Sequence, residues 1–151
     1  MEKDTNYTNL RKSIFKLKPS DIGILLDNDE QVFAAVADMN VTNGVATLVC
    51  VFDGTVSLYF SNGAMRMGLG RIESIRQAGC SFLFSSGQCL KEMRIAKEPY
   101  DIPPNNMRIY LLTRIGIYVA ELKNDKTNPK EISFLNFLVQ NVLNKIREAT
   151  E

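Results

Sequence analysis

The residues best suited to chemistry lie in one glycine-rich stretch, and the candidate ligand-binding residues there are Ser61, Asn62, Gly63, Arg66, Gly68, Gly70 and Arg71. Glycines leave backbone N–H groups open to an anion, and arginines supply positive charge. The spacing matches neither a phosphate-binding loop nor the dinucleotide motif G-x-G-x-x-G, because Leu69 and Gly70 follow Gly68. The leading interpretation is a connection whose glycines adopt positive φ angles, and the alternative is a site for a small anion or nucleotide.

Histidine is absent from the 151 residues. The usual general base, the commonest transition-metal ligand and the central residue of Ser/His/Asp machinery are therefore missing. A carboxylate or lysine mechanism stays open as an alternative, although no pair of acidic residues has a spacing that nominates it. The sequence predicts a protein that is not an enzyme, with no catalytic residues, no metal site and no cofactor.

The three cysteines are too few and too scattered for a disulfide framework. Cys50 lies in an apolar strand. Cys80 and Cys89 lie on one predicted helix, where a rotation of about 100° per residue turns them to opposite faces. We expect all three to be small buried side chains.

Composition and charge are those of an ordinary globular protein, with 45% hydrophobic and 23% charged residues. The net charge of +1 provides no field that would attract nucleic acid or anionic lipid. No apolar run reaches the roughly 20 residues of a membrane span, and the first residues contain no apolar signal core. We expect one cytoplasmic domain over 1–151, without nucleic-acid or membrane partners.

Helical spacing of apolar residues predicts helices over 3–18 and 71–94. In the second of these, Gly87 makes a break near 85–88 possible. A third helix is expected near the end of the chain, with Asn128 as its N-cap and Pro129 at its first helical position, and it runs to about Arg147. Pro19 marks the end of the first helix, since proline cannot continue a helix interior.

Strand patterns are expected over 32–39, 45–52, 55–61, 107–113 and 116–122. The dipeptides Asn43-Gly44 and Asp53-Gly54 suit two-residue hairpin turns between the first three strands. The order α-βββ-α-ββ-α predicts the α+β class, with a five-stranded, mostly antiparallel sheet and helices packed on it. For the first strand, a helix remains the alternative.

Two of these strands differ in what should cover them. Strand 45–52 is apolar on both faces, so both faces should be covered. Strand 55–61 alternates, and its hydroxyl row of Thr55, Ser57, Tyr59 and Ser61 is expected to be half wet or to face a partner.

The last helix carries two aromatic residues outside its predicted core stripe, Phe134 and Phe137, on a face shared with Asn141. Two phenylalanines on a solvent face favour a protein interface. Met65 and Met67 are adaptable apolar side chains that suit the same use. The alternatives are that more of the helix is buried within the monomer, that the aromatics are simply exposed, and that the methionines turn into the core.

The stretch DGTVSLYFSNGA at 53–64 resembles a glycine-rich hairpin segment of small uncharacterised bacterial proteins, with Ala64 in place of one glycine. That resemblance implies no activity. The predicted element order is similar to two groups of dimeric domains. These are the type III secretion chaperone-like domains, which hold client segments, and the roadblock/longin-like domains, which are platforms for GTPases.

We therefore expect a non-enzymatic protein–protein interaction module, either chaperone-like or a scaffold/adaptor, that acts as a homodimer. The alternative is a domain that binds a small anionic ligand or nucleotide through the glycine-rich loop at 61–71.

Overall fold

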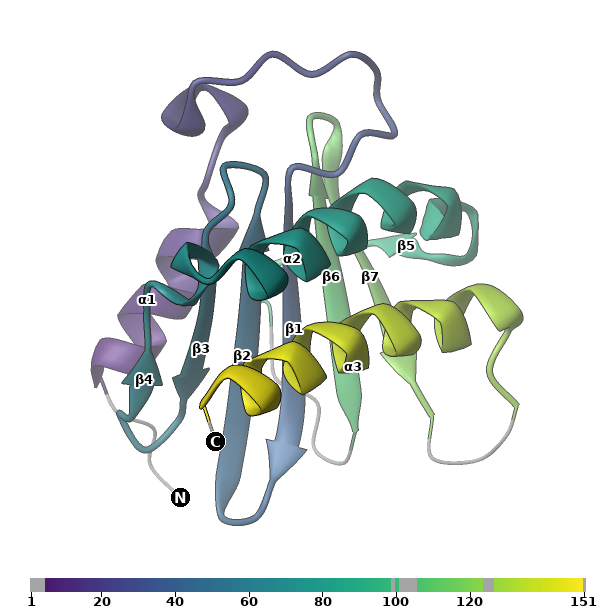
Figure 1. The fold of residues 1–151 in the computed structure, drawn as a ribbon. Coiled ribbons are helices and arrows are strands. Elements are labelled where there is room, and N and C mark those ends of the chain that lie inside the picture. Colours follow the sequence, from purple (N-terminus) through teal and green to yellow (C-terminus); the bar gives the residue numbers. More distant parts are fainter. Residues whose placement is uncertain (1–4, 99, 101–105, 124–126, 151) are drawn as a thin grey trace.

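The computed structural model describes residues 5–98, 100, 106–123 and 127–150. In chain order (Figure 1) the elements are α1 (Thr5–Phe15), the 3₁₀ turn η1 (Pro19–Ile22), β1 (Ala34–Val41), β2 (Gly44–Val51), β3 (Val56–Phe60), β4 (Met65–Arg66), η2 (Leu69–Arg71), α2 (Glu73–Ser86), η3 (Gly87–Glu92), β5 (Arg94–Ile95), β6 (Met107–Thr113), β7 (Gly116–Leu122) and α3 (Lys130–Thr150). The predicted α+β class is confirmed.

The strands form one seven-stranded sheet in the order β4-β3-β2-β1-β6-β7-β5, and every neighbouring pair is antiparallel. The prediction of five strands is therefore wrong. The two additional strands, β4 and β5, are two residues long, which is too short for an alternating hydrophobic pattern to reveal them. β1 lies at the centre and joins the first meander to the β6–β7 hairpin, which confirms that this segment is a strand.

The first hairpin turn lies one residue earlier than predicted. Val41 pairs with Gly44, so the two turn residues are Thr42 and Asn43, and Asn43 has a φ of 67°. The next turn contains Gly54 at a φ of 95°. Asparagine and glycine tolerate this left-handed region, which explains why these dipeptides signalled turns.

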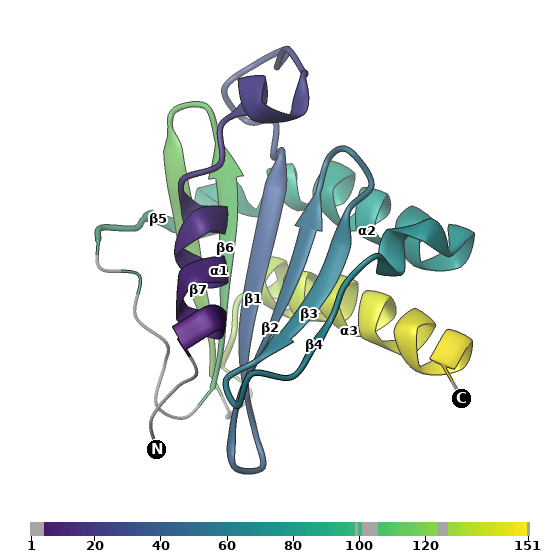
Figure 2. The same ribbon diagram turned by 90° about the vertical axis from the view of Figure 1, so that its left-hand side faces the viewer.

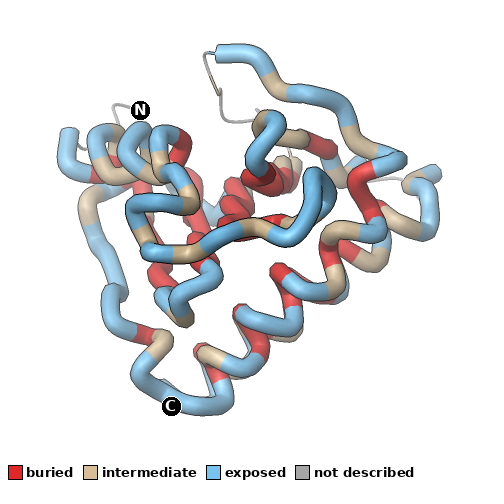
Figure 3. The backbone as a smooth tube through the Cα atoms, turned by 90° about the horizontal axis from the view of Figure 1, so that it is seen from above, coloured by how far each residue is buried: buried red, intermediate tan, exposed pale blue. Residues whose placement is uncertain are grey.

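The helices pack on both faces of the sheet. α2 and α3 lie side by side on one face, and α1 lies on the opposite face (Figures 1 and 2). Each face has its own apolar cluster, and β2 contributes Leu48 to the α2/α3 side and Val49 to the α1 side. Figure 3 shows buried residues along the strands and in stripes on the helices. The prediction that β2 is covered on both faces is confirmed.

Three of the four residues of the hydroxyl row at 55–61 are buried, contrary to expectation. Ser57, Tyr59 and Ser61 are each less than 5% exposed, whereas Thr55 is exposed. Tyr59 belongs to the apolar cluster on the α1 side, together with Tyr7 and Tyr110. The sequence did not indicate that α1 would cover this face.

The predicted middle helix breaks near 85–88, where Gly87 made a break possible. α2 ends at Ser86, a 3₁₀ helix follows over Gly87–Glu92, and the chain then enters β5. A Cβ atom at Gly87 would lie 2.9 Å from the carbonyl oxygen of Glu30, so glycine lets the chain pass close to the loop before β1. At Gly79 a Cβ would lie 3.0 Å from Val56 Cγ2, so this glycine seats α2 on β3.

The first and last helices also differ from their predicted bounds. α1 spans Thr5–Phe15 instead of 3–18, and residues 1–4 lie outside the described part of the chain. α3 begins at Lys130, and the Pro129 carbonyl accepts hydrogen bonds from the N–H groups of Ile132 and Ser133. The Asn128 side chain bonds to the backbone N–H and carbonyl of Lys123, so it fastens the preceding loop. The helix therefore begins one residue after Pro129, the predicted first helical position.

Candidate functional site

A hollow of about 810 Å³ lies between α2 and the loop that precedes β1. We call it the α2 groove. Its apolar lining includes Val32, Phe52, Leu83 and Phe84. Phe84 is 92% exposed and Phe52 is 45% exposed. Because burial of a phenylalanine stabilises by about 1.5–3 kcal/mol, these two side chains are an unused source of binding energy.

The exposure of Phe84 follows from helix geometry. Its neighbours Phe82 and Leu83 are buried against the sheet, and a rotation of about 100° per residue turns the next side chain away from it. Cys80 lies one helical turn before Phe84 and also lines the hollow, and both side chains are exposed. We call this side of the helix the outer face of α2.

The charged residues near the two ends of α2 differ. Asp27 and Glu30 border the α2 groove, and the described residues that line it include neither lysine nor arginine. Arg71 lies directly before the other end of the helix and is exposed, and Arg76 lies one turn further on. Glu73 also lies at that end, so its excess positive charge is small.

The predicted ligand loop is held together by its own polar atoms. The buried Ser61 hydroxyl oxygen accepts a hydrogen bond from the Val45 N–H at 2.9 Å, and the Asn62 side chain accepts one from the Ala64 N–H at 2.9 Å. Gly63 and Gly68 have φ angles of 98° and 72°, which favour glycine. These residues form turns, as the leading interpretation of the sequence held.

Gly70 has a packing role. A Cβ atom there would lie 2.0 Å from the Gly54 carbonyl oxygen, so only glycine lets η2 pass over the β2–β3 turn. The Arg76 guanidinium donates to the Gly70 carbonyl at 3.0 Å and fastens the same crossing. Arg66 and Arg71 remain exposed. An anionic ligand at this loop stays a prediction.

Of the two phenylalanines on α3 that were predicted to face solvent, one does so and the other does not. Phe137 is 63% exposed, but Phe134 is partly buried and packs against the core. Their rings are stacked with centroids 6.3 Å apart. Asn141 is also partly buried. The description of both phenylalanines as solvent-facing is therefore wrong for Phe134, because α3 buries a wider stripe than its periodicity indicated.

The structure does not bring the predicted interface residues together. Met65 and Met67 are 38% and 59% exposed, beside the far end of α3, where Arg66 reaches Thr150. Phe137 stands 13 residues before Thr150, which is about 20 Å along a helix. Two separate apolar patches result.

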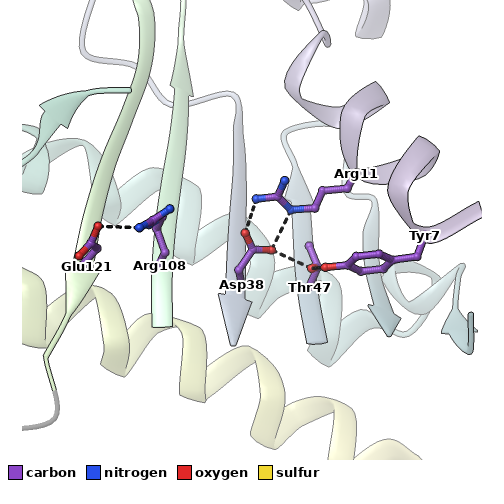
Figure 4. A network of polar contacts seen from close by, with 6 residues as sticks. All are labelled: Tyr7, Arg11, Asp38, Thr47, Arg108 and Glu121. Atoms are coloured by element: carbon purple, nitrogen blue, oxygen red, sulfur yellow. Dashed lines mark hydrogen bonds and ion pairs between the residues drawn. The ribbon is translucent and has the colours of Figure 1, made fainter. Parts of the chain in front are cut away.

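A buried polar cluster joins α1 to the sheet (Figure 4). The Arg11 guanidinium donates to both carboxylate oxygens of Asp38, and the Thr47 hydroxyl donates to the same carboxylate at 2.7 Å. Since a hydroxyl has one proton to donate, Tyr7 must be the donor in its 2.7 Å bond to Thr47. Asp38 is wholly buried, so this cluster positions α1 and is closed to a substrate.

Burial changes the ionisation of this cluster. It raises the pKa of the Tyr7 phenol, and the nearby negative charge of Asp38 acts in the same direction. For Arg11, burial lowers the pKa, but the hydrogen bond and charge of Asp38 outweigh burial and leave the pKa raised. The cluster therefore holds a neutral phenol and a charged guanidinium. Sequence analysis missed it because its members are 27 and 40 residues apart.

A second hollow, of about 370 Å³, is basic. Arg94, Lys97 and Arg108 line it beside two tyrosines. The Glu121 carboxylate already accepts hydrogen bonds from Arg94 at 3.2 Å and from Arg108 at 2.8 Å. Because two of its three cationic side chains already bind this carboxylate, the basic hollow is a weaker candidate than the α2 groove.

The cysteines differ in exposure. Cys50 and Cys89 are buried as predicted, whereas Cys80 is exposed, because it lies on the outer face of α2. Burial raises the pKa of the Cys50 thiol to about 12.

Within the described residues, no group of three or more Cys, Asp or Glu side chains is placed to hold a metal ion. No described helix combines the length and the apolar character that a membrane crossing requires.

No protein-family model, curated protein or solved structure matches this chain. The resemblances noted for 53–64 and for the element order therefore stay predictions.

Proposed function

We propose that this chain is a non-enzymatic protein–protein interaction module, chaperone-like or a scaffold/adaptor, that works as a homodimer. The observation that carries the proposal is the α2 groove with Phe84 beside it. A phenylalanine that is 92% exposed next to an apolar hollow is typical of a surface that another protein covers.

The acidic and apolar lining of the α2 groove favours a protein partner over a small anionic ligand. Its charged lining residues are Asp27 and Glu30, which repel anions. Its apolar lining combines an aromatic residue from the β2–β3 turn with one from α2, and aromatic residues are enriched in interface centres. An apolar surface bordered by polar groups is the usual composition of a protein interface.

Native mass spectrometry of the wild type and of the Phe52→Ser/Phe84→Ser double variant tests the proposal. We expect a wild-type dimer and a mainly monomeric variant with an unchanged circular dichroism spectrum. Phe137→Ser is the matched control, because it removes an exposed phenylalanine from α3. A wild type that stays monomeric at every concentration would contradict the homodimer proposal.

A further inference from the structure

We infer that the basic hollow binds a small soluble phosphomonoester, whose phosphate group is held by Arg94, Lys97 and Arg108. The inference goes beyond the proposed function and does not depend on it. The basic hollow lies on the α1 side of the sheet, whereas the α2 groove lies beside α2 on the other side.

The strand register brings the floor of the basic hollow together. Tyr110 lies opposite Val119, and Val119 lies opposite Arg94, so these three side chains share one face of β6, β7 and β5. Arg108 stands two residues before Tyr110 and therefore points to the same face. This face is the α1 side, because Tyr110 and Val119 belong to the apolar cluster there.

Aromatic rings form the wall of the basic hollow next to α1. Phe15, the last residue of α1, packs edge-on against Tyr110 with ring centroids 4.8 Å apart. After β5 the chain returns toward α1, and Tyr100 stacks on Phe15 at 4.5 Å. Tyr100 and Tyr110 both line the hollow. The wall therefore consists of side chains that fix one another by packing.

Positive charge exceeds negative charge around the basic hollow. None of its described lining residues is acidic, and three are cationic. Glu121 lies beside them on β7 and accepts hydrogen bonds from Arg94 and Arg108 through one carboxylate oxygen (Figure 4). Glu98, which is exposed and next to Lys97 in the chain, offsets part of the remaining charge. The excess that is left attracts an anion.

The two arginines can take different parts in holding a phosphate. The Arg108 side chain is 18% exposed and supplies a charge at the floor, where Glu121 holds it in place. The Arg94 side chain is 64% exposed and reaches Glu121 through one terminal nitrogen. Because a guanidinium carries five N–H donors in a planar fork, Arg94 can bind Glu121 and a phosphate oxygen together. The exposed Lys97 adds a third cation at the rim.

The rest of the lining fits an organic substituent on the phosphate. Ile95, Ala96 and Val119 are apolar, and the Tyr100 ring lies beside them. The volume of about 370 Å³ is at the lower end of the range of small-ligand sites, roughly 300–1,000 Å³. A small phosphomonoester places its charge on the cations and its substituent on the apolar wall.

Calorimetric titration with phenyl phosphate tests the inference at pH 8, where a phosphomonoester is a dianion because its second pKa is about 6. Wild type should bind one molecule per chain with a Kd below about 1 mM. Arg94→Gln/Lys97→Gln, which changes two exposed side chains, should bind at least tenfold more weakly. Arg66→Gln/Arg71→Gln is the matched control in the glycine-rich loop and should bind as wild type does. Absence of saturable binding to wild type, or loss of binding in the control instead, would overturn the inference.

Glu121→Gln gives a gain that misfolding cannot imitate. Removal of the carboxylate that competes for both arginines should tighten phenyl phosphate binding at least threefold, whereas Glu148→Gln on α3, an equal change in net charge, should not. Equal tightening by both variants would reduce the effect to net charge and refute the site.

Two other probes test the class of ligand. Benzoate, a monoanion with the same ring, should bind at least tenfold more weakly than phenyl phosphate, and equal affinities would refute the choice of a phosphate. A phosphotyrosine peptide that bound tenfold more tightly than phenyl phosphate would make a phosphoprotein the ligand and overturn the small-molecule assignment. None of these outcomes depends on whether the chain is a dimer.

Discussion

Replacing Arg11 by methionine should lower the free energy of unfolding by about 3–5 kcal/mol, the cost of removing one partner of a buried ion pair. Asp38 is wholly buried, and Arg11 donates to both of its carboxylate oxygens. Methionine keeps much of the apolar stem but leaves this charge with the Thr47 hydroxyl as its donor. The guanidinium also lies 4.9 Å from the Phe15 ring centroid, a contact worth about 0.5–1 kcal/mol. A domain of this size has about 5–15 kcal/mol to lose.

Urea unfolding followed by circular dichroism measures this loss. The double variant Arg11→Met/Asp38→Leu removes both charges, and we expect it to be more stable than Arg11→Met alone, because no unpaired charge remains buried. Arg11→Lys should fall between wild type and Arg11→Met, since lysine keeps the charge but cannot donate to both oxygens in the same geometry. If Arg11→Met unfolded within about 1 kcal/mol of wild type, the carboxylate could not be sealed beneath α1, and the reasoning would be refuted.

Two further predictions concern packing and pH. Gly70→Ala should destabilise by about 3 kcal/mol, the upper end of the usual cost of overpacking, seen as a lower Tm, because its Cβ would lie 2.0 Å from the Gly54 carbonyl oxygen. Gly23→Ala, which has a φ of 71° but no atom within 4 Å, should cost only about 1–2 kcal/mol from backbone strain, and an equal loss for both would argue against the close crossing. Burial raises the pKa of Cys50 from 9.0 to about 12, so the native state keeps a proton that the unfolded chain releases. Its contribution is present below pH 9 and should be lost toward pH 12, at up to about 1.4 kcal/mol per pH unit, and Cys50→Ala should flatten that slope in urea titrations at several pH values.

Local patterns predicted most of the fold. The apolar character of 45–52 on both faces required cover on both sides of β2, and helices supply it. Asn43 and Gly54 marked the hairpin turns because they tolerate positive φ angles. Periodicity also located three helices, although Pro19 bounded the first only approximately and Ser86 ends the second earlier than its apolar stripe indicated.

The sites were harder to predict because they depend on contacts between distant residues. Asp38 contacts Arg11 only because β1 and α1 pack together, and no sequence spacing indicates that contact. Phe84 stood within a predicted helix, but its exposure depends on which side of that helix packs against the sheet. The prediction for Phe134 failed for the opposite reason, because α3 is buried over a wider arc than its own pattern suggested.

The two shortest strands have a consequence for solubility. β4 and β5 form the two edges of the sheet, each is two residues long, and each contains an arginine, Arg66 or Arg94. Long apolar edges invite strands of other molecules to add on, which leads to aggregation, whereas short charged edges discourage such addition. Edges of this kind therefore discourage extension of the sheet from one copy of the chain to the next.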